Sequence, residues 1–367
     1  MGQTAGIKIN KRQLSSLVNN ATKSAEAANL VYVSDTDAGI SRHKKADKFY
    51  YKFSGKTIND AETLQRIKSL VLPPAWEQVW ICTLSNGHLQ ATGFDKKNRK
   101  QYKYHPLWNA LRNQTKFHHL HDFGKALPAI RSQLQKDLLQ PDLSLKRVLA
   151  TIVSVMECTC IRIGNSMYEK LYGSFGLTTL KDQHVKIEGS QVKFSFKGKK
   201  GVYHDITLKN KKLANAIKQC RDIPGKELFQ FYDKEGKRHS VDSGMVNNYI
   251  KEISGGNFTA KDFRTWAGSL RALEAFKEME FAETTTAIKK NIVAVLDIVA
   301  SHLGNTRTVC KKYYVHPVVI DHYTNNTMNK YLKNTAATQC SDRTDISIEE
   351  KVLMHMLEDA VTVVVAA

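Results

Sequence analysis

A regular hydrophobic pattern runs through residues 145–164. Apolar residues recur there at spacings of one, three and four, which predicts a helix with one buried face. The residues of that face are Val148, Leu149, Ile152, Val153, Met156 and Cys160. We expect Gly164 to cap the C-terminus of this helix and Arg162 to lie at its end, where the helix dipole favours a cation.

Two later stretches also have helical spacing. Thr259 can cap a helix that carries Arg264 about one turn from its start. A second helix is expected over residues 284–302, and Gly304 followed by Asn305 is typical of a C-terminal cap. The apolar stripe of this second helix consists of Ile288, Ile292, Val295, Leu296 and Val299.

Residues 31–108 have a different texture, rich in aromatic and β-branched residues and punctuated by glycines. The segments 48–53 (KFYYKF) and 79–84 (VWICTL) are typical of strands. One helix is expected near Asp60–Leu70, and Pro73 and Pro74 follow it. This part of the chain is therefore predicted to be a small, mostly β domain.

A β-hairpin is predicted at residues 192–208. Apolar residues alternate on both sides of the turn KGKKG at residues 197–201, and Lys199 lies at the tip. A lysine in a turn usually serves only to increase solubility, so this position alone does not indicate a functional role for Lys199. The alternating residues are Val192, Phe194, Phe196, Val202, Ile206 and Leu208.

The segment 97–108 (KNRKQYKYHPLW) combines cations with aromatic residues. On a strand, Tyr102 and Tyr104 share one face, and Arg99 and other cations flank them. Such a ribbon could contact duplex DNA, with cations on phosphates and phenols on sugar, phosphate or base edges. The alternative is an ordinary solvated hairpin.

The composition favours a polyanionic partner. The chain has 367 residues, with 55 Lys and Arg against 35 Asp and Glu, a net charge of +20. Neutralising phosphates with release of counterions is the usual source of nucleic-acid affinity. The sequence contains no apolar run of about 20 residues, so no membrane span is expected. The cysteines at 82, 158, 160, 220, 310 and 340 form no CxxC pair, which favours reduced thiols inside a cell.

These patterns predict an α+β protein. Residues 1–30 are interpreted as a flexible polar arm and residues 31–108 as the β-rich N-terminal domain. Residues 109–325 are expected to form a larger, mainly helical domain that contains the hairpin. Residues 326–367 are interpreted as a C-terminal tail with a helix expected from Ser347.

The segment LGNTRTVCKKYYVHP, residues 303–317, holds a candidate nucleophile. Tyr314 follows Asn305 by nine residues and lies among Arg307, Lys311 and Lys312. A free phenol titrates near pH 10 and is a poor nucleophile at neutral pH, so nearby cations would be needed to activate it. Tyrosines next to lysines are common, and this segment alone does not establish catalysis.

Taken together, the motifs resemble those of the small type IB DNA topoisomerases of bacteria and large DNA viruses, over roughly residues 34–316. The family's order is arginine in IRxG, lysine in GK on a hairpin, arginine in KDxRT, Asn or His, and a tyrosine nine residues later. The corresponding residues here are Arg162, Lys199, Arg264, Asn305 and Tyr314. LPPAWEQVWI, HLQATGFD and RKQYKYH resemble the family's N-terminal clamp.

The resemblance implies that Tyr314 attacks a DNA phosphodiester and forms a 3′-phosphotyrosyl link while the 5′-hydroxyl leaves. Religation after strand rotation then relaxes supercoiled duplex DNA without ATP, and the chain has no GxxxxGK[ST] phosphate loop. No nucleotide or other cofactor and no metal are expected, because cations of the protein replace the metal and no acidic cluster is present.

The resemblance also implies a role for each matched residue. Arg162, Arg264 and Asn305 would stabilise the non-bridging oxygens of the transition state, a task suited to fixed, planar guanidinium groups. Lys199 would protonate the leaving oxygen, and Lys261 would assist. The base for the tyrosine is not identified by any motif.

DNA-binding residues follow from the same resemblance. Arg99, Tyr102 and Tyr104 would contact DNA from the clamp, and Tyr168 would contact a phosphate near the cleavage point. A monomer that encircles double-stranded DNA inside a cell or viral compartment is expected, without a membrane partner.

Two other functions are compatible with parts of this pattern. A tyrosine recombinase or integrase uses a similar catalytic set, but it usually has His where this chain has Lys261, and its N-terminal domain is helical. A non-catalytic DNA-binding clamp protein would retain the charge, but all five catalytic positions here hold competent residues.

Overall fold

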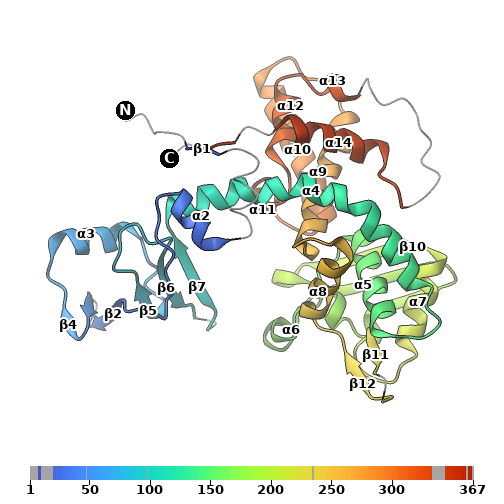
Figure 1. The fold of residues 1–367 in the computed structure, drawn as a ribbon, viewed down its shortest axis with the longest axis horizontal. Coiled ribbons are helices and arrows are strands. Elements are labelled where there is room, and N and C mark those ends of the chain that lie inside the picture. Colours follow the sequence, from blue (N-terminus) through green and yellow to red (C-terminus); the bar gives the residue numbers. More distant parts are fainter. Residues whose placement is uncertain are drawn as a thin grey trace. The chain divides into compact units, whose positions relative to one another are not determined.

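The computed structural model divides the chain into two units. The first comprises residues 1–118 and 361–367, and the second comprises residues 119–360 (Figure 1). The described residues are 7–9, 20–46, 48–96, 98–233, 235–332, 344–360 and 363–365; only the backbone is described at 7–9, 113–118 and 363–365. Most of the expected N-terminal arm, and residues 333–343 of the expected tail, lie outside the described residues.

The first unit is built on an antiparallel sheet of six strands in the order β4-β3-β2-β5-β6-β7. Its strands are β2 (Ile40–Lys45), β3 (Lys48–Phe53), β4 (Lys56–Thr57), β5 (Glu77–Ile81), β6 (Leu89–Phe94) and β7 (Lys100–Tyr104). The predicted helix is present as α3 (Ala61–Ser69), and the Asp60 side chain caps it by accepting from the Thr63 N–H. Ile67 of α3 packs against the sheet residues Ile40, Val79, Ile81 and Ala91.

A second small core of the first unit lies beside α2 (Ala21–Ala27). It contains Ala25, Ala28, Leu30, Trp108 and Leu111. The short strands β1 (Ile7–Ile9) and β13 (Val363–Val365) pair with each other in antiparallel register. Helix α4 (Pro106–Leu138) continues the chain from the first unit into the second.

The second unit is mainly helical, so the predicted α+β class is confirmed. Helix α5 (Leu145–Thr159) is buried along most of its length and packs against α7 (Lys211–Arg221), α8 (Ser243–Ser254) and α9 (Ala260–Lys277). The remaining helices are α6 (Ser166–Tyr172), α10 (Thr285–Leu303), α11 (Arg307–Tyr313), α12 (Pro317–Thr324), α13 (Asn329–Leu332) and α14 (Ile348–Asp359).

A three-stranded sheet in the order β10-β9-β8 belongs to the same unit. It consists of β8 (Val185–Glu188), β9 (Gln191–Lys197) and β10 (Tyr203–Lys209), and the turn η3 (Lys199–Gly201) joins the last two. The predicted alternation is confirmed on β9, where Val192, Phe194 and Phe196 are all buried. On the partner strand Leu208 is buried and Ile206 half-buried, but the prediction was wrong for Val202, which precedes β10 and is exposed. A short hairpin of β11 (Gln230–Tyr232) and β12 (Arg238–Ser240) completes the strands of the unit.

The prediction for the end of α5 was wrong. The helix ends at Thr159, because Cys160 takes the left-handed conformation and caps it. The next residues form tertiary hydrogen bonds instead of helical ones: the Leu177 N–H donates to the Arg162 carbonyl at 2.9 Å. Arg162 therefore lies on a loop beyond the helix, and Gly164 belongs to that loop.

A buried ion network joins four helices of the second unit. Arg131 of α4 donates to Glu350 of α14 at 2.8 Å and to Glu157 of α5 at 2.8 Å. The same Glu350 carboxylate accepts from Trp266 Nε1 of α9 at 3.0 Å. Burial raises the pKa of Glu350, but the hydrogen bond and charge of Arg131 outweigh burial, and the pKa lies below its ordinary value of 4.5.

Among the described residues, every helix is too short or too polar to span a bilayer. The cysteines at 82, 160, 220 and 310 are free thiols, and Cys340 lies outside the described residues.

Replacing Glu350 with glutamine should lower the free energy of unfolding by about 3 kcal/mol, because one partner of a buried charge pair is lost. Urea unfolding measures this change. The difference from the wild type should shrink as the pH falls through the lowered pKa of Glu350, since a carboxyl with a depressed pKa stabilises the fold only while it is ionised.

The adjacent Glu349 provides the matched control. Its carboxylate forms a more exposed ion pair with Lys277 at 3.0 Å. Glu349→Gln should change the free energy of unfolding by less than about 1 kcal/mol. Equal effects of the two substitutions would contradict a stabilising role for the buried network.

Candidate active site

Tyr314 is held at the end of α11 against α9. Its backbone N–H donates to the Cys310 carbonyl at 2.9 Å, and its carbonyl accepts from Ser269 Oγ of α9 at 3.2 Å. Gly268 of α9 permits this close approach, because a Cβ atom there would lie 2.7 Å from the Tyr314 carbonyl oxygen. These contacts fix the backbone of Tyr314 against α9.

Arg264 of α9 lies beneath the Tyr314 ring. The residue is only 5% exposed, and its guanidinium carbon lies 5.2 Å from the ring centroid. One guanidinium nitrogen donates to the Cys160 carbonyl, and another donates to the Leu303 carbonyl at 2.8 Å. These carbonyls belong to the C-terminal ends of α5 and α10, where backbone acceptors are unsatisfied and the helix dipole favours a cation.

Arg162 and Asn305 meet at the end of α10. Gly304 caps this helix in the left-handed conformation with φ of 58°, and the Asn305 N–H donates to the Ala300 carbonyl at 3.0 Å. Arg162 donates to the Gly304 carbonyl at 3.2 Å and to Asn305 Oδ1. The cap predicted from the sequence is confirmed, and it places the Asn305 amide beside the guanidinium group.

The site contains two buried donors without a partner among the described residues. They are Asn305 Nδ2 and Arg264 Nε. Unpaired buried donors are rare in folded proteins, and such a group is costly unless a ligand or water accepts from it. Both belong to the same cluster around Tyr314, so the cluster is suited to an incoming ligand with several acceptor oxygens.

The electrostatics of the cluster also favour an anion. Burial, followed by the charge of Arg264, lowers the pKa of Arg162 to about 10. In the described part of the chain, neither guanidinium group forms an ion pair with a carboxylate; their acceptors are backbone carbonyls and the Asn305 amide. Two uncompensated cations at pH 7 create a positive potential that an oxyanion would neutralise.

Two of the sequence-predicted lysines are not joined to this cluster. Lys199 is exposed in the turn η3, and Lys261 is exposed in the first turn of α9. Neither side chain forms a hydrogen bond or ion pair within the described residues. The structure therefore brings together Arg162, Arg264, Asn305 and Tyr314.

Sequence reasoning missed His204 of β10. Its ring lies against Gly304 and also against Gly198, the residue before Lys199. Burial lowers the pKa of His204, and the charges of Arg162 and then Arg264 lower it further. The only sequence signal for this position was a polar residue in an alternating strand, opposite Phe196.

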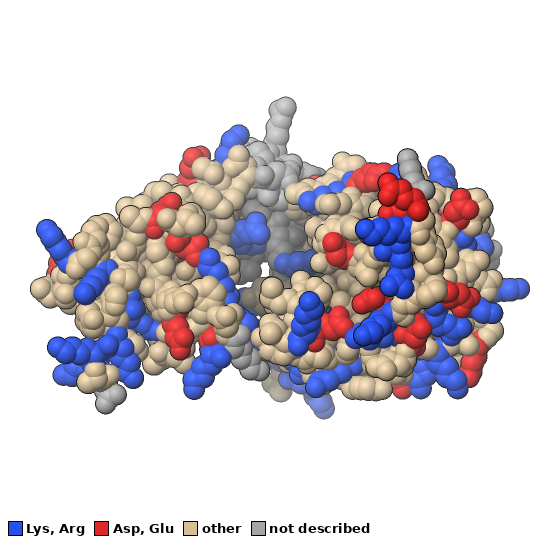
Figure 2. Space-filling model, turned by 90° about the horizontal axis from the view of Figure 1, so that it is seen from below, with Lys and Arg blue, Asp and Glu red and all other residues tan. Residues whose placement is uncertain are grey.

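The predicted DNA-contacting residues of the first unit lie on or next to β7. The rings of Tyr102 and Tyr104 stack at 6.0 Å with an interplanar angle of 8°, so they share one face as predicted. Tyr102 is 49% exposed. Arg99 forms an ion pair with Asp95 at 2.5 Å, which holds the arginine at the start of the strand. On the face drawn in Figure 2, Lys and Arg side chains gather in the first unit and are also spread over the second.

Tyr168 lies in the second unit on α6. The helix has no buried residue, and Tyr168 is 48% exposed with its ring 5.8 Å from that of Tyr172. Asn165 caps the helix by accepting from the Met167 N–H at 2.8 Å. This short helix follows the Arg162 loop directly, so its tyrosine is tethered close in sequence to the cluster.

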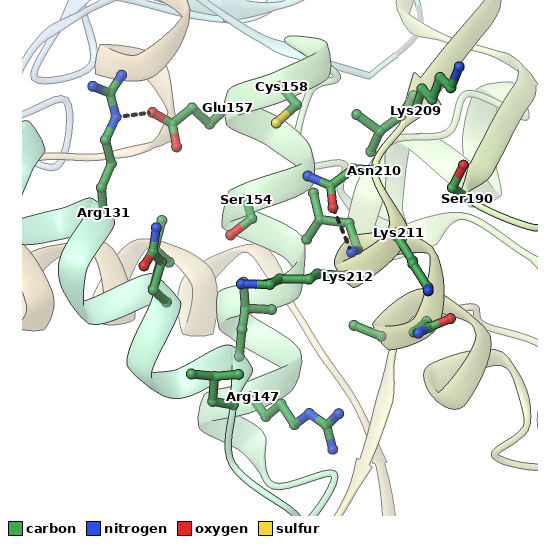
Figure 3. A pocket seen from close by; sticks show the side chains of 18 of the residues that line it. Arg131, Arg147, Ser154, Glu157, Cys158, Ser190, Lys209, Asn210, Lys211 and Lys212 are labelled. Carbon is green, nitrogen blue, oxygen red and sulfur yellow. Dashed lines mark hydrogen bonds and ion pairs between the residues drawn. The ribbon is translucent and has the colours of Figure 1, made fainter. Parts of the chain in front are cut away.

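A separate cavity of about 1350 Å³ lies in the second unit (Figure 3). Arg131, Arg147, Glu157 and the segment 209–213 line it, and none of the residues around Tyr314 does. No group of three or more His, Cys, Asp or Glu residues suited to a metal occurs in the described part of the chain.

Comparison with known proteins identifies the family. The family model described as "Eukaryotic DNA topoisomerase I, catalytic core" matches residues 98–341, and "Bacterial DNA topoisomerase IB, N-terminal domain" matches residues 48–95. The chain is 33% identical to DNA topoisomerase 1B of Acanthamoeba polyphaga mimivirus over 296 residues, which cover 78% of this chain and 88% of the relative. It is 24% identical to DNA topoisomerase I of Monkeypox virus and to DNA topoisomerase 1B of Vaccinia virus (strain Copenhagen), each over 71% of this chain and 81% of the relative. The chain belongs to the type IB DNA topoisomerase family.

Proposed function

We propose that this enzyme relaxes supercoiled duplex DNA by cutting and rejoining one strand through a covalent link to Tyr314. The observation that carries the proposal is the pair of guanidinium groups, Arg162 and Arg264, held beside Tyr314 without a carboxylate partner in the described residues. Such a pair is suited to a phosphodiester, whose charge increases on the non-bridging oxygens in the transition state.

The chemical step follows from this arrangement. The Tyr314 phenol gives up its proton to water, its oxygen attacks phosphorus, a phosphorus–oxygen bond to the tyrosine forms, and the bond to the 5′-oxygen breaks. Arg162, Arg264 and the free Nδ2 of Asn305 stabilise the non-bridging oxygens, and the fixed donors need no rearrangement as charge develops. The covalent link conserves the bond energy, so religation requires neither ATP nor a metal ion.

Lys199 is proposed as the general acid for the leaving 5′-oxygen, and Lys261 as an assisting cation. Both are exposed and unpaired within the described residues, so both are available to a bound DNA strand. An alkoxide is a poor leaving group, and a positioned acid typically contributes about 10²–10⁴-fold to such a step.

Binding is assigned to both units. Tyr102, Tyr104 and Arg99 contact duplex DNA from the first unit, and Tyr168 contacts a phosphate near the cleavage point. The net charge of +20 supports this partner, and binding should weaken steeply with salt. The enzyme acts as a monomer without a nucleotide cofactor, in the intracellular or viral compartment that holds the DNA. The six-stranded sheet of the first unit favours this function over a recombinase, whose N-terminal domain is helical.

Tyr314→Phe should abolish relaxation and formation of the covalent adduct, because the attacking oxygen is removed. Affinity for duplex DNA should remain nearly unchanged, since binding depends mainly on phosphate contacts elsewhere. Plasmid relaxation without ATP or magnesium, and trapping of the adduct in denaturant, measure the two effects. Tyr313→Phe is the control and should retain both activities; normal relaxation by Tyr314→Phe would overturn the assignment.

Lys199→Ala should slow single-turnover cleavage by about 10²–10⁴-fold at an ordinary 5′-oxygen, as expected for loss of a general acid. Cleavage at a 5′-bridging sulfur should be slowed much less, because a thiolate leaves without a proton. Lys200→Ala, in the same turn, should have little effect on either substrate. Equal slowing of Lys199→Ala on both substrates would exclude the general-acid role.

An oxyanion should stabilise the enzyme without any reaction. Sulfate at ten times its dissociation constant should raise the free energy of unfolding by about 1.4 kcal/mol, because it binds only the folded cation pair. Thermal unfolding at fixed ionic strength, with chloride as the reference salt, measures the increment. Arg162→Gln should lose most of it, whereas Arg307→Gln, which removes an exposed pair with Asp297, should keep it. An undiminished increment in Arg162→Gln would exclude this anion site.

A further inference from the structure

The ring of His204 contacts two glycines of the active region, Gly198 and Gly304. A Cβ atom on Gly198 would lie 2.6 Å from ring atoms Cδ2 and Nε2, and one on Gly304 would lie 2.3 Å from Cε1. These distances are too short for any side chain, so both positions require glycine while the ring stays where it is. The ring also stacks on Phe196 at 5.1 Å with an interplanar angle of 22°.

Each glycine precedes a residue with a proposed role. Gly198 precedes Lys199, and its backbone N–H donates to the Val202 carbonyl at 2.7 Å, which closes the turn. Gly304 precedes Asn305, and its carbonyl accepts from Arg162 at 3.2 Å. One ring therefore connects the turn that carries the proposed acid to the helix end that carries the proposed phosphate ligands.

The surroundings of the ring favour packing over proton transfer. Arg162 and Arg264 are the charged groups that act on His204, and both disfavour its protonated form. Within the described residues no hydrogen bond is made by either ring nitrogen. A neutral ring in contact with two backbone segments acts mainly as a spacer.

We propose that His204 is a positioning residue that sets the distance between Lys199 and the Arg162–Asn305 cluster. This inference rests on the proposed function, because it assigns a support to the general acid. Without the ring, the turn would lose its contact with the end of α10, and Lys199 would no longer be held at the leaving oxygen. A misplacement of about 1 Å can reduce a rate by about 10²-fold.

The test compares single-turnover cleavage of a 5′-oxygen substrate and of a 5′-bridging sulfur substrate. His204→Ala should slow oxygen cleavage by about 10²-fold and slow sulfur cleavage only slightly, because the defect acts through proton donation. His204→Phe keeps a flat ring and should recover most of the oxygen rate. Asp205→Asn, on the same strand and exposed in a pair with Lys193, should resemble the wild type.

Each outcome decides the inference. Equal slowing of His204→Ala on both substrates, or no slowing on either, would overturn it. Thermal unfolding checks that each variant is folded, and if His204→Ala is not, His204→Gln provides the variant without a ring and should show the same substrate dependence. Lys199→Ala and Tyr314→Phe are measured in parallel. If Lys199→Ala is rescued by sulfur and Tyr314→Phe is inactive while His204→Ala lacks rescue, only the role of His204 fails.

Discussion

The active region depends on two like charges, Arg264 buried and Arg162 partly buried, that lie close together without a carboxylate partner in the described residues. Each guanidinium group is held by backbone carbonyls at helix ends, with Arg264 on the ends of α5 and α10 and Arg162 on the Gly304 cap of α10. Helix C-termini offer unsatisfied acceptors and a partial negative charge, which offset part of the cost of burying a cation. A carboxylate would offset it more fully but would occupy the place proposed for the DNA phosphate. The neutral acceptors thus leave the charge available.

This arrangement requires helix ends to converge, and much of the second unit serves that convergence. Gly268 of α9 allows a close approach of this helix to the Tyr314 backbone and to Leu303 of α10. Helix α9 carries both Arg264 and Trp266, and Trp266 donates to Glu350 of α14. The C-terminal helix is therefore anchored to the helix that holds the arginine. Stability of the unit and geometry of the site are properties of the same helix packing.

The sequence predicted what local patterns determine. Helices α5, α9 and α10, the Thr259 and Gly304 caps, the β9–β10 hairpin and the shared face of Tyr102 and Tyr104 all follow from spacing and turn chemistry. What was missed depends on contacts distant in sequence. Cys160 is a left-handed cap without a glycine, so the helix was expected to continue to Arg162 and to end at Gly164. Of the cations next to Tyr314 in sequence, Arg307 is paired with Asp297, and the contacts of His204 with Gly198 and Gly304 join positions that are distant in sequence.

The different exposure of the arginines and of Lys199 fits the different jobs proposed for them. A guanidinium group keeps its proton through the whole cycle and needs no proton exchange with water. Its burial therefore does not slow turnover, and it strengthens the electrostatic effect of the group on the phosphate. A general acid must lose a proton during cleavage and regain one before the next, and exchange with water is simplest at an exposed turn. An exposed turn could also move away from the cluster, and proton transfer to the leaving oxygen would then slow. A rigid ring between Gly198 and Gly304 reconciles the two demands, since it fixes the base of the turn and leaves the lysine side chain in solvent.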